Sequence, residues 1–199
     1  MTLCRTPELT HMAAGGEAGA ASLQHPPQTR TPVPHNLQEV PTMTPLAVGE
    51  KAPEFSLPST TGRSVTLADL LDDSTFLVLA FYPKQRTSVC GAQLEMINEF
   101  LDQFDERDAA VVGISVDPLE DLLSWADEAN FDFPLLSDAE PKGATAEAYG
   151  VMSDKGVSER AYFIVDADGT IVYSYLSPMG ENPGVNRLFA ALDEAAGDQ

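Results

Sequence analysis

The spacing of apolar residues changes several times along the chain from about residue 48 onward. Phe76–Tyr82 is a continuous apolar run of the length of a buried strand, and Ala110–Val116 is a second predicted strand of this kind. Because the first run contains no alternating polar positions, we expect a central strand that is covered on both faces. Between the two strands, apolar residues recur at helical spacing, at Leu94, Ile97, Leu101 and Phe104. This spacing predicts a helix that begins near Cys90.

Two hairpins are predicted from turn residues that separate short apolar segments. In the first, Phe55–Pro58 and Ser64–Leu67 flank Thr61-Gly62. In the second, Ala161–Val165 and Thr170–Leu176 flank the turn Asp166-Ala167-Asp168-Gly169. Glycine supplies the positive φ that such a turn requires.

Helix-start signals predict the remaining elements. Asp117-Pro118-Leu119-Glu120 places an N-cap residue before a proline and an acid, which predicts a helix that runs towards Asn130. A short apolar segment at Phe133–Leu136 and a helix around Thr145–Tyr149 follow. Asn182-Pro183 is expected to cap the last helix, whose apolar positions are Val185, Leu188, Phe189 and Leu192. This order predicts an α/β fold class with a mixed central sheet flanked by helices.

The first 43 residues differ from the rest in composition. They contain six prolines and a Gly/Ala-rich stretch without helical or alternating periodicity, which predicts disorder. Met43 is a plausible natural start, so residues 1–43 are either a disordered tail or a start-site artefact, and residues 44–199 form the domain. All three histidines, at positions 11, 25 and 35, lie in residues 1–43. Cys/His and Ser/His/Asp catalysis and the common histidine metal sites are therefore excluded from residues 44–199.

The chain is strongly acidic, with 31 acidic and 11 basic residues and a formal net charge of −20 at pH 7. We expect no nucleic-acid partner, because phosphate contacts need a cationic face. Only four of the basic residues are lysines. An acidic surface with few lysines indicates a halophilic protein, since the Debye length falls to about 3 Å at 1 M salt and self-repulsion is screened.

Neither a membrane segment nor a disulfide framework is expected. The apolar run Phe76–Tyr82 is far shorter than the roughly 18 residues of a membrane helix. Glu17 interrupts the only N-terminal stretch of small residues, so no signal-peptide core is predicted. Cys4 and Cys90 are the only two cysteines. We therefore expect a cytoplasmic protein.

The candidate chemistry lies in the segment that leads from the first buried strand into the following helix. It places Cys90 in the first helical turn, where unpaired backbone N–H groups and the positive end of the helix dipole favour a thiolate. The net charge of −20 opposes a thiolate, so we expect a local positive group beside this cysteine. The residues alone do not identify that group.

Pro83, Thr87 and Cys90 follow the strand in the spacing Pro-x-x-x-Thr-x-x-Cys. With this motif the chain resembles the peroxiredoxin family of the AhpC/TSA type. The resemblance covers about residues 46–195 and includes the segments Val48–Phe55, Gly113–Asp117, Phe131–Asp138 and Arg160–Asp166. Trp125 and the segment Ala148–Val151 make the chain similar to the one-cysteine alkyl hydroperoxide reductase E type. The resemblance implies a thioredoxin-like fold and a thiol-dependent peroxidase.

The resemblance also implies roles for individual residues. Cys90 is the expected nucleophile, which attacks a hydroperoxide and becomes a sulfenic acid. Thr87 is expected to hold the peroxide, Arg160 to stabilise the thiolate and the polarised O–O bond, and Pro83 to shield the thiolate from water. Many relatives have a glutamate that orients an arginine three positions after the cysteine, and here that residue is Gln93. No metal, flavin or haem cofactor is implied.

The number of cysteines decides the expected catalytic cycle. Glu95 stands where some relatives have a resolving cysteine, and residues 44–199 contain a single thiol. We therefore expect a one-cysteine mechanism that reduces hydrogen peroxide and organic hydroperoxides. Its external reductant is a thioredoxin-like protein or a low-molecular-weight thiol. Cys4 is an alternative resolving thiol, because a flexible tail of about 40 residues spans roughly 35 Å.

Two further expectations concern assembly and an alternative function. The family resemblance implies a homodimer that packs through the surface near the active site. The alternative is a non-catalytic redox sensor or chaperone-like binding module, in which slow oxidation of Cys90 changes partner binding. A reaction with peroxide at the rate of a free thiol in solution favours this alternative.

Overall fold

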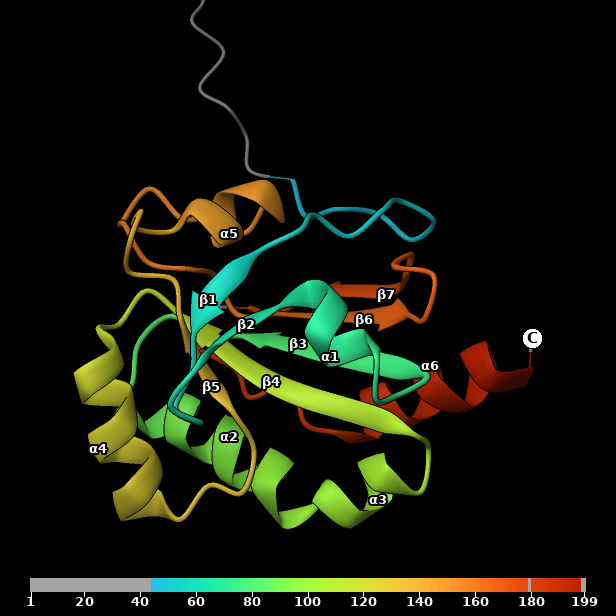
Figure 1. The fold of residues 1–199 in the computed structure, drawn as a ribbon, viewed down its shortest axis with the longest axis horizontal. Coiled ribbons are helices and arrows are strands. Elements are labelled where there is room, and N and C mark those ends of the chain that lie inside the picture. The colour runs from blue at the N-terminus through green and yellow to red at the C-terminus, as the bar shows by residue number, and fades with distance from the viewer. Residues whose placement is uncertain (1–43, 179, 198–199) are drawn as a thin grey trace, which may run out of the picture. The chain divides into compact units, whose positions relative to one another are not determined.

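A five-stranded mixed sheet forms the centre of the computed structural model, which describes residues 44–178 and 180–197 (Figure 1). The strand order is β5-β4-β3-β6-β7, with β3 (Phe76–Phe81) in the middle. β4 (Ala109–Ser115) and β5 (Leu135–Ser137) run parallel to β3, whereas β6 (Ala161–Asp166) is antiparallel to both β3 and β7 (Ile171–Leu176). Every residue of β3 is buried, which confirms the predicted central strand.

The two faces of the sheet bury separate apolar clusters, as the alternation of side chains along a strand requires. Phe76, Val78 and Ala80 face the cluster that includes α2 (Ser88–Glu99), α3 (Leu101–Asp105), α4 (Leu119–Ala129) and α6 (Asn186–Gly197). Leu77, Leu79 and Phe81 face the opposite cluster. That cluster includes the hairpin β1 (Ser56–Pro58) and β2 (Ser64–Thr66), α1 (Leu67–Leu71) and α5 (Ala144–Ala148).

Both predicted hairpins are confirmed. β1 pairs with β2 in antiparallel register, and β6 pairs with β7 across the turn that contains Gly169, whose φ is 75°. The predicted helix near Cys90 is also present, but it begins two residues earlier, at Ser88. It is interrupted at Phe100, whose φ of −110° and ψ of 18° separate α2 from α3.

Two predicted helix starts are wrong in detail. Asp117 does not cap α4: the N-cap is Pro118, without a side-chain cap bond, and the helix begins at Leu119. The Asp117 carboxylate instead accepts the N–H of Gln85 in the loop between β3 and α2, so a buried contact with a distant residue replaces the helix cap. Asn182-Pro183 does not cap α6, which begins only at Asn186. The Asn182 side chain accepts the Gly184 N–H instead and forms a turn before the helix.

The prediction for residues 1–43 concerns a segment outside the described part of the chain. Within the described ranges, no helix has both the length and the apolar character that are needed to cross a membrane.

Candidate active site

The candidate site forms where three segments meet at one end of the sheet. Phe81, the last residue of β3, pairs with Ile114 of parallel β4 and with Ala161 of antiparallel β6. The loop after β3, the residues after β4 and the residue before β6 therefore converge. This topology brings Cys90, Asp117 and Arg160 together from distant parts of the sequence.

Cys90 lies in the first turn of α2 and is 1% exposed. Thr87 is the N-cap residue, and its Oγ1 accepts the Cys90 N–H at 3.4 Å. The Thr87 hydroxyl also lies 3.4 Å from the Lys84 carbonyl oxygen, to which it donates. No acidic residue occurs in the first turn of α2. The positive end of the helix dipole therefore has no carboxylate within this turn to offset it.

Arg160 supplies the positive group expected beside Cys90. It directly precedes β6, is 2% exposed, and its Nη2 donates to Cys90 Sγ at 3.2 Å. A buried guanidinium that donates to sulfur stabilises negative charge there, because water does not screen the interaction.

Gln93 holds the other arm of this guanidinium. It is fully buried on α2, and its Oε1 accepts from Arg160 Nη1. Arginine has only donors, so this contact requires the amide oxygen to face Arg160. A neutral amide orients the guanidinium without neutralising its charge.

Pro83 lies in the loop between β3 and α2 and is half-buried. Thr87 ends this loop and is exposed. The structure thus brings Cys90, Thr87 and Arg160 into hydrogen-bond contact and places Pro83 in the same loop.

The loop itself has two anchors that the sequence analysis missed. The Gln85 N–H donates to Asp117 Oδ2 at 2.8 Å. The Arg86 guanidinium forms an ion pair with Glu128 of α4, in which Nη2 donates to Oε1 at 2.9 Å, and it also donates to Ser124 at 3.0 Å. Arg86 has a φ of 56°, an unusual backbone for a residue with a side chain. No signal in the sequence indicates the Arg86 pair. The position of Asp117 after a strand parallel to β3 could have indicated the other anchor.

Titratable groups around the loop respond to burial and charge. Burial raises the pKa of Tyr82 far above its ordinary value of 10.0, and the charges of Asp117 and Cys90 raise it further. The phenol therefore stays neutral even in alkaline solution, and it packs edge-on against Trp125, with ring centroids 5.9 Å apart. The hydrogen bond from Arg86 lowers the pKa of Glu128. Glu128 therefore stays ionised and keeps Arg86 in place.

A surface groove of about 450 Å³ lies beside the first turn of α2. Its lining residues include Thr87, Ser88, Glu95, Trp125 and the Arg86 and Glu128 pair. Thr87 and Ser88 of the helix start line this groove, whereas the buried Cys90 does not.

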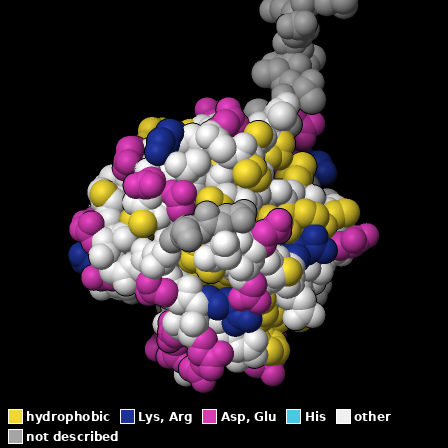
Figure 2. Space-filling model, turned by 90° about the vertical axis from the view of Figure 1, so that its right-hand side faces the viewer, with side chains coloured by type: hydrophobic (Ala, Val, Ile, Leu, Met, Phe, Trp, Pro, Cys, Tyr) yellow, Lys and Arg dark blue, Asp and Glu magenta, His cyan; other side chains and the backbone are white. Residues whose placement is uncertain are grey.

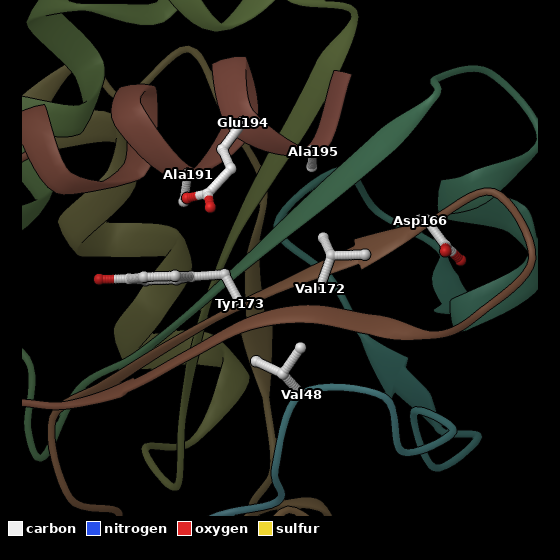
Figure 3. Close-up of a pocket in the computed structure, with 7 residues that line it drawn as sticks. All are labelled: Val48, Asp166, Val172, Tyr173, Ala191, Glu194 and Ala195. Carbon is white, nitrogen blue, oxygen red and sulfur yellow. The ribbon is translucent and has the colours of Figure 1, made fainter. Parts of the chain in front are cut away.

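A second pocket, of about 540 Å³, lies between β7, α6 and Val48 (Figure 3). Its polar side chains include Tyr173 and the carboxylates of Asp166 and Glu194, and none of its residues is a thiol or a cation. This pocket therefore lacks the groups needed for cysteine chemistry.

Acidic side chains outnumber basic ones on the face that Figure 2 shows. Figure 2 shows Asp and Glu spread around one face, with few Lys and Arg among them. Arg160 therefore provides positive charge in a protein whose net charge is −20. No cluster of three or more His, Cys, Asp or Glu side chains suited to a metal ion occurs among residues 44–178 and 180–197.

Comparisons with known proteins show the family to which the chain belongs. The family model described as the AhpC/TSA family matches residues 48–174. Alkyl hydroperoxide reductase E of Mycobacterium tuberculosis is 36% identical over 137 residues, which cover 68% of this chain and 89% of that protein. Peroxiredoxin Bcp of Escherichia coli is 33% identical over 140 residues, which cover 67% of this chain and 87% of that protein.

A solved structure of a related protein also resembles this chain. Peroxidoxin BcpB from Mycobacterium tuberculosis superimposes with a TM-score of 0.68 at 31% identity, and the match covers 75% of this chain and 97% of that one. The mixed sheet and flanking helices thus have the thioredoxin-like arrangement of thiol peroxidases. The chain belongs to the AhpC/TSA family of peroxiredoxins. It is a thiol-dependent peroxidase, and hence an oxidoreductase.

Proposed function

We propose that Cys90 is the nucleophile of a one-cysteine cycle that reduces hydrogen peroxide and small organic hydroperoxides. The observation that carries the proposal is the buried contact between Arg160 Nη2 and Cys90 Sγ at 3.2 Å, with Gln93 on the other arm of the guanidinium. This arrangement stabilises a thiolate, which is the reactive form of cysteine.

In the oxidative half of the cycle, the thiolate attacks the terminal oxygen of the hydroperoxide. An S–O bond forms, the O–O bond breaks, and the sulfur is oxidised to a sulfenic acid while the peroxide is reduced. The leaving oxygen takes a proton and departs as water or an alcohol. Arg160 stabilises the charge that develops on the oxygens, and a positioned donor of this kind contributes about 10²- to 10³-fold in rate.

Thr87 and Pro83 complete the proposed site. The Thr87 hydroxyl lies at the N-terminus of α2 and is placed to bind a peroxide oxygen. The half-buried ring of Pro83 limits access of water to the sulfur. This role needs no polar atom.

In the reductive half, an external thiol attacks the sulfenic sulfur, and a mixed disulfide and water form. A second thiol then attacks the mixed disulfide and regenerates the Cys90 thiolate. The proposal rests on Cys90 being the single cysteine of residues 44–199. A thioredoxin-like protein and a low-molecular-weight thiol are the two candidate reductants. Because Cys90 is 1% exposed, the sulfur has to move outwards to meet either of them.

Stopped-flow oxidation of the reduced protein tests the proposal. Trp125 is the only tryptophan and packs edge-on against Tyr82 at the start of the active-site loop, so its fluorescence reports on the site. Wild type, Cys90→Ser and Cys4→Ser are compared with hydrogen peroxide, and a sulfenic-acid trap is read by intact mass. We expect rapid oxidation that only Cys90→Ser abolishes, and one trapped sulfenic acid per chain.

The same experiment decides between the alternatives. Turnover with an external thiol that Cys4→Ser leaves intact supports the one-cysteine cycle. A Cys4–Cys90 disulfide in wild type would instead make Cys4 the resolving thiol. Oxidation at the rate of a free thiol would contradict the peroxidase cycle and favour a redox sensor or binding module.

We also propose a cytoplasmic homodimer. A chain with two cysteines and no disulfide framework suits a reducing compartment, and the dimer rests on the family resemblance. Light scattering at working concentration in high salt tests the assembly. A monomeric mass would contradict the dimer.

The charge of −20 supports a further proposal, that the protein is halophilic. Screening of self-repulsion should make the free energy of unfolding rise between 0.1 M and 2 M KCl. Denaturant titrations at several salt concentrations measure this. A stability that is constant or falls with salt would contradict the proposal.

A further inference from the structure

Asp117 was expected to cap α4, but its carboxylate binds the loop between β3 and α2. It is 8% exposed, and Oδ2 accepts both the Gln85 N–H at 2.8 Å and the Ser115 hydroxyl at 2.9 Å. The N-terminus of α4 is left without a side-chain cap. The Asp117 carboxylate thus does not cap α4, a contact that would stabilise that helix, and binds the active-site loop instead.

The Gln85 N–H lies at a sensitive point of that loop. Two residues later, Thr87 caps α2 and touches the Cys90 N–H. Between them, Arg86 holds a φ of 56°, a conformation that persists only where the surroundings impose it. Arg86 is fixed from the other side by Glu128 and Ser124.

The Asp117 side chain is itself rigidly held. Ser115 donates to it from the end of β4, and the Asp117 backbone carbonyl accepts the Ser137 hydroxyl at 2.7 Å from the end of β5. A carboxylate that accepts a backbone N–H forms a charge-assisted bond, which is stronger and more directional than a neutral one. Through Asp117, the loop between β3 and α2 is therefore held by the ends of β4 and β5 as well as by α2.

We propose that Asp117 is a positioning residue for the peroxidase reaction: its carboxylate fixes the Gln85 backbone and thereby places the Thr87 hydroxyl against Cys90. This inference rests on the proposed function of Cys90 and Thr87. Asp117 touches neither the sulfur nor the peroxide, so it acts through the loop. Misplacement of a reacting pair by about 1 Å costs up to 10²-fold in rate.

The test compares two reactions of Cys90 in the full chain at high salt. Oxidation by hydrogen peroxide requires the positioned loop, whereas alkylation by iodoacetamide requires the Cys90 thiolate and its outward movement but not the Thr87 hydroxyl. In Asp117→Ala we expect peroxide oxidation to slow about tenfold or more, and alkylation to stay within about twofold of wild type. Asp117→Asn keeps an oxygen that can accept both bonds, so we expect it to retain most of the peroxide rate.

Asp138 provides a matched control. It also follows a strand, is 1% exposed, and accepts the backbone N–H groups of Thr145 and Ala146 at 3.1 and 2.9 Å at the start of α5. Asp138→Ala should lower the thermal midpoint and leave the ratio of the two rates unchanged. A similar loss of that ratio in Asp138→Ala would show a general structural effect and overturn the proposal.

Other outcomes also decide the question. The proposal is overturned if Asp117→Ala oxidises like wild type, if both of its rates fall together, or if Asp117→Asn is as slow as Asp117→Ala. Should Asp117→Ala not fold, amide hydrogen exchange of wild type replaces it: a protected Gln85 N–H supports the anchor, and exchange at the rate of an open loop overturns it. Wild-type oxidation at a free-thiol rate would instead contradict the proposed function, while hydrogen exchange still tests the anchor.

Discussion

The helices α2 and α4 start at the same end of the sheet, after neighbouring parallel strands, and they are built differently. α4 has Glu120 and Asp121 in its first turn and no side-chain cap. α2 has a threonine cap and no acidic residue in its first turn. The chain has 31 acidic residues, so the absence of one from the first turn of α2 is a notable difference between the two helices.

The difference shows how each helix uses its positive end. In α4 carboxylates compensate the dipole and stabilise the helix. In α2 the same position holds Cys90, so the helix dipole is left to favour the thiolate of the proposed nucleophile. Arg160 adds a buried positive charge to α2 alone, at 3.2 Å from the sulfur. The first turn of α4 therefore stabilises its helix, whereas the first turn of α2 can favour the proposed chemistry of Cys90.

Of the changes considered, replacing Arg160 is expected to have the largest effect on the rate at which peroxide oxidises Cys90. Arg160→Lys keeps the charge but loses the fork that contacts Gln93 and Cys90 at once. We expect peroxide oxidation of Cys90 to slow about 10²- to 10³-fold, as measured by stopped flow. Arg107→Lys, which alters an arginine paired with Asp193, is the control and should react like wild type. A loss below threefold in Arg160→Lys would show that charge alone suffices.

Removing the cap of α2 tests whether Thr87 has more than a structural role. Thr87→Val deletes the hydroxyl, and we expect about 10²-fold slower oxidation together with a loss of about 1 kcal/mol in stability. Thr87→Ser keeps the hydroxyl and should retain most of both. The matched control is Thr66→Val, which removes the side-chain cap of α1. It should lose stability without a change in rate, and an equal fall in rate would contradict a role for Thr87 in the reaction.

Tyr82 directly follows β3 and packs against Trp125 in the middle of α4, so it connects the loop before α2 to α4. Burial raises its pKa, so the unfolded chain loses the phenol proton near pH 10 and the folded chain does not. Above that pH the unfolded state binds fewer protons, and the free energy of unfolding falls as pH rises. Burial raises the pKa of Tyr149 and Tyr162 in the same way. We expect each tyrosine to contribute a slope of up to about 1.4 kcal/mol per pH unit.

Denaturant titrations between pH 9 and pH 11 measure this slope, and Tyr82→Phe should reduce it. Phe104→Leu, which alters a buried ring without a titratable group, should lower stability equally at all these pH values. An unchanged slope in Tyr82→Phe would show that this phenol ionises in the folded protein.

The smallest expected effect comes from giving α2 the character of α4. Ser88 is the exposed first residue of α2, and Ser88→Glu places a carboxylate there. Stability should rise by about 0.3–1 kcal/mol while peroxide oxidation slows about threefold, because the added charge stabilises the helix and opposes the thiolate. Ser88→Gln is the uncharged control, and Glu120→Gln in α4 should lower stability without changing the rate. If Ser88→Glu and Ser88→Gln react equally fast in dilute salt, the contrast between the helix starts has no catalytic meaning.

Much of the fold could be predicted because its signals are local. The continuous apolar run of β3 and the turn at Gly169 lie within short stretches of chain, and the structure has them where the sequence predicts them. Pro83, Thr87 and Cys90 are also close in sequence, so the motif itself indicated the chemistry. The break at Phe100 was not predicted, because the apolar face continues through it from Ile97 to Phe104.

Contacts between distant residues could not be predicted in the same way. Gln93 and Arg160 lie 67 positions apart, and Arg86 and Glu128 lie 42 apart. Asp117 shows the reason most clearly. The sequence around it favours a helix cap, which is typically worth about 1 kcal/mol. The folded protein offers the carboxylate a buried, charge-assisted bond to the Gln85 N–H, and this contact replaces the cap.

The sequence by itself determined the order of strands and helices and the loop that leads to the proposed nucleophile, since periodicity, turn residues and a short motif act over a few positions. The tertiary structure decided which charged and polar side chains surround that nucleophile. Arg160 and Asp117 reach the Cys90 loop only because the ends of β3, β4 and β6 meet at one end of the sheet, whereas Gln93 follows Cys90 on α2 itself. Burial there makes each hydrogen bond strong enough to override the preferences of the local sequence.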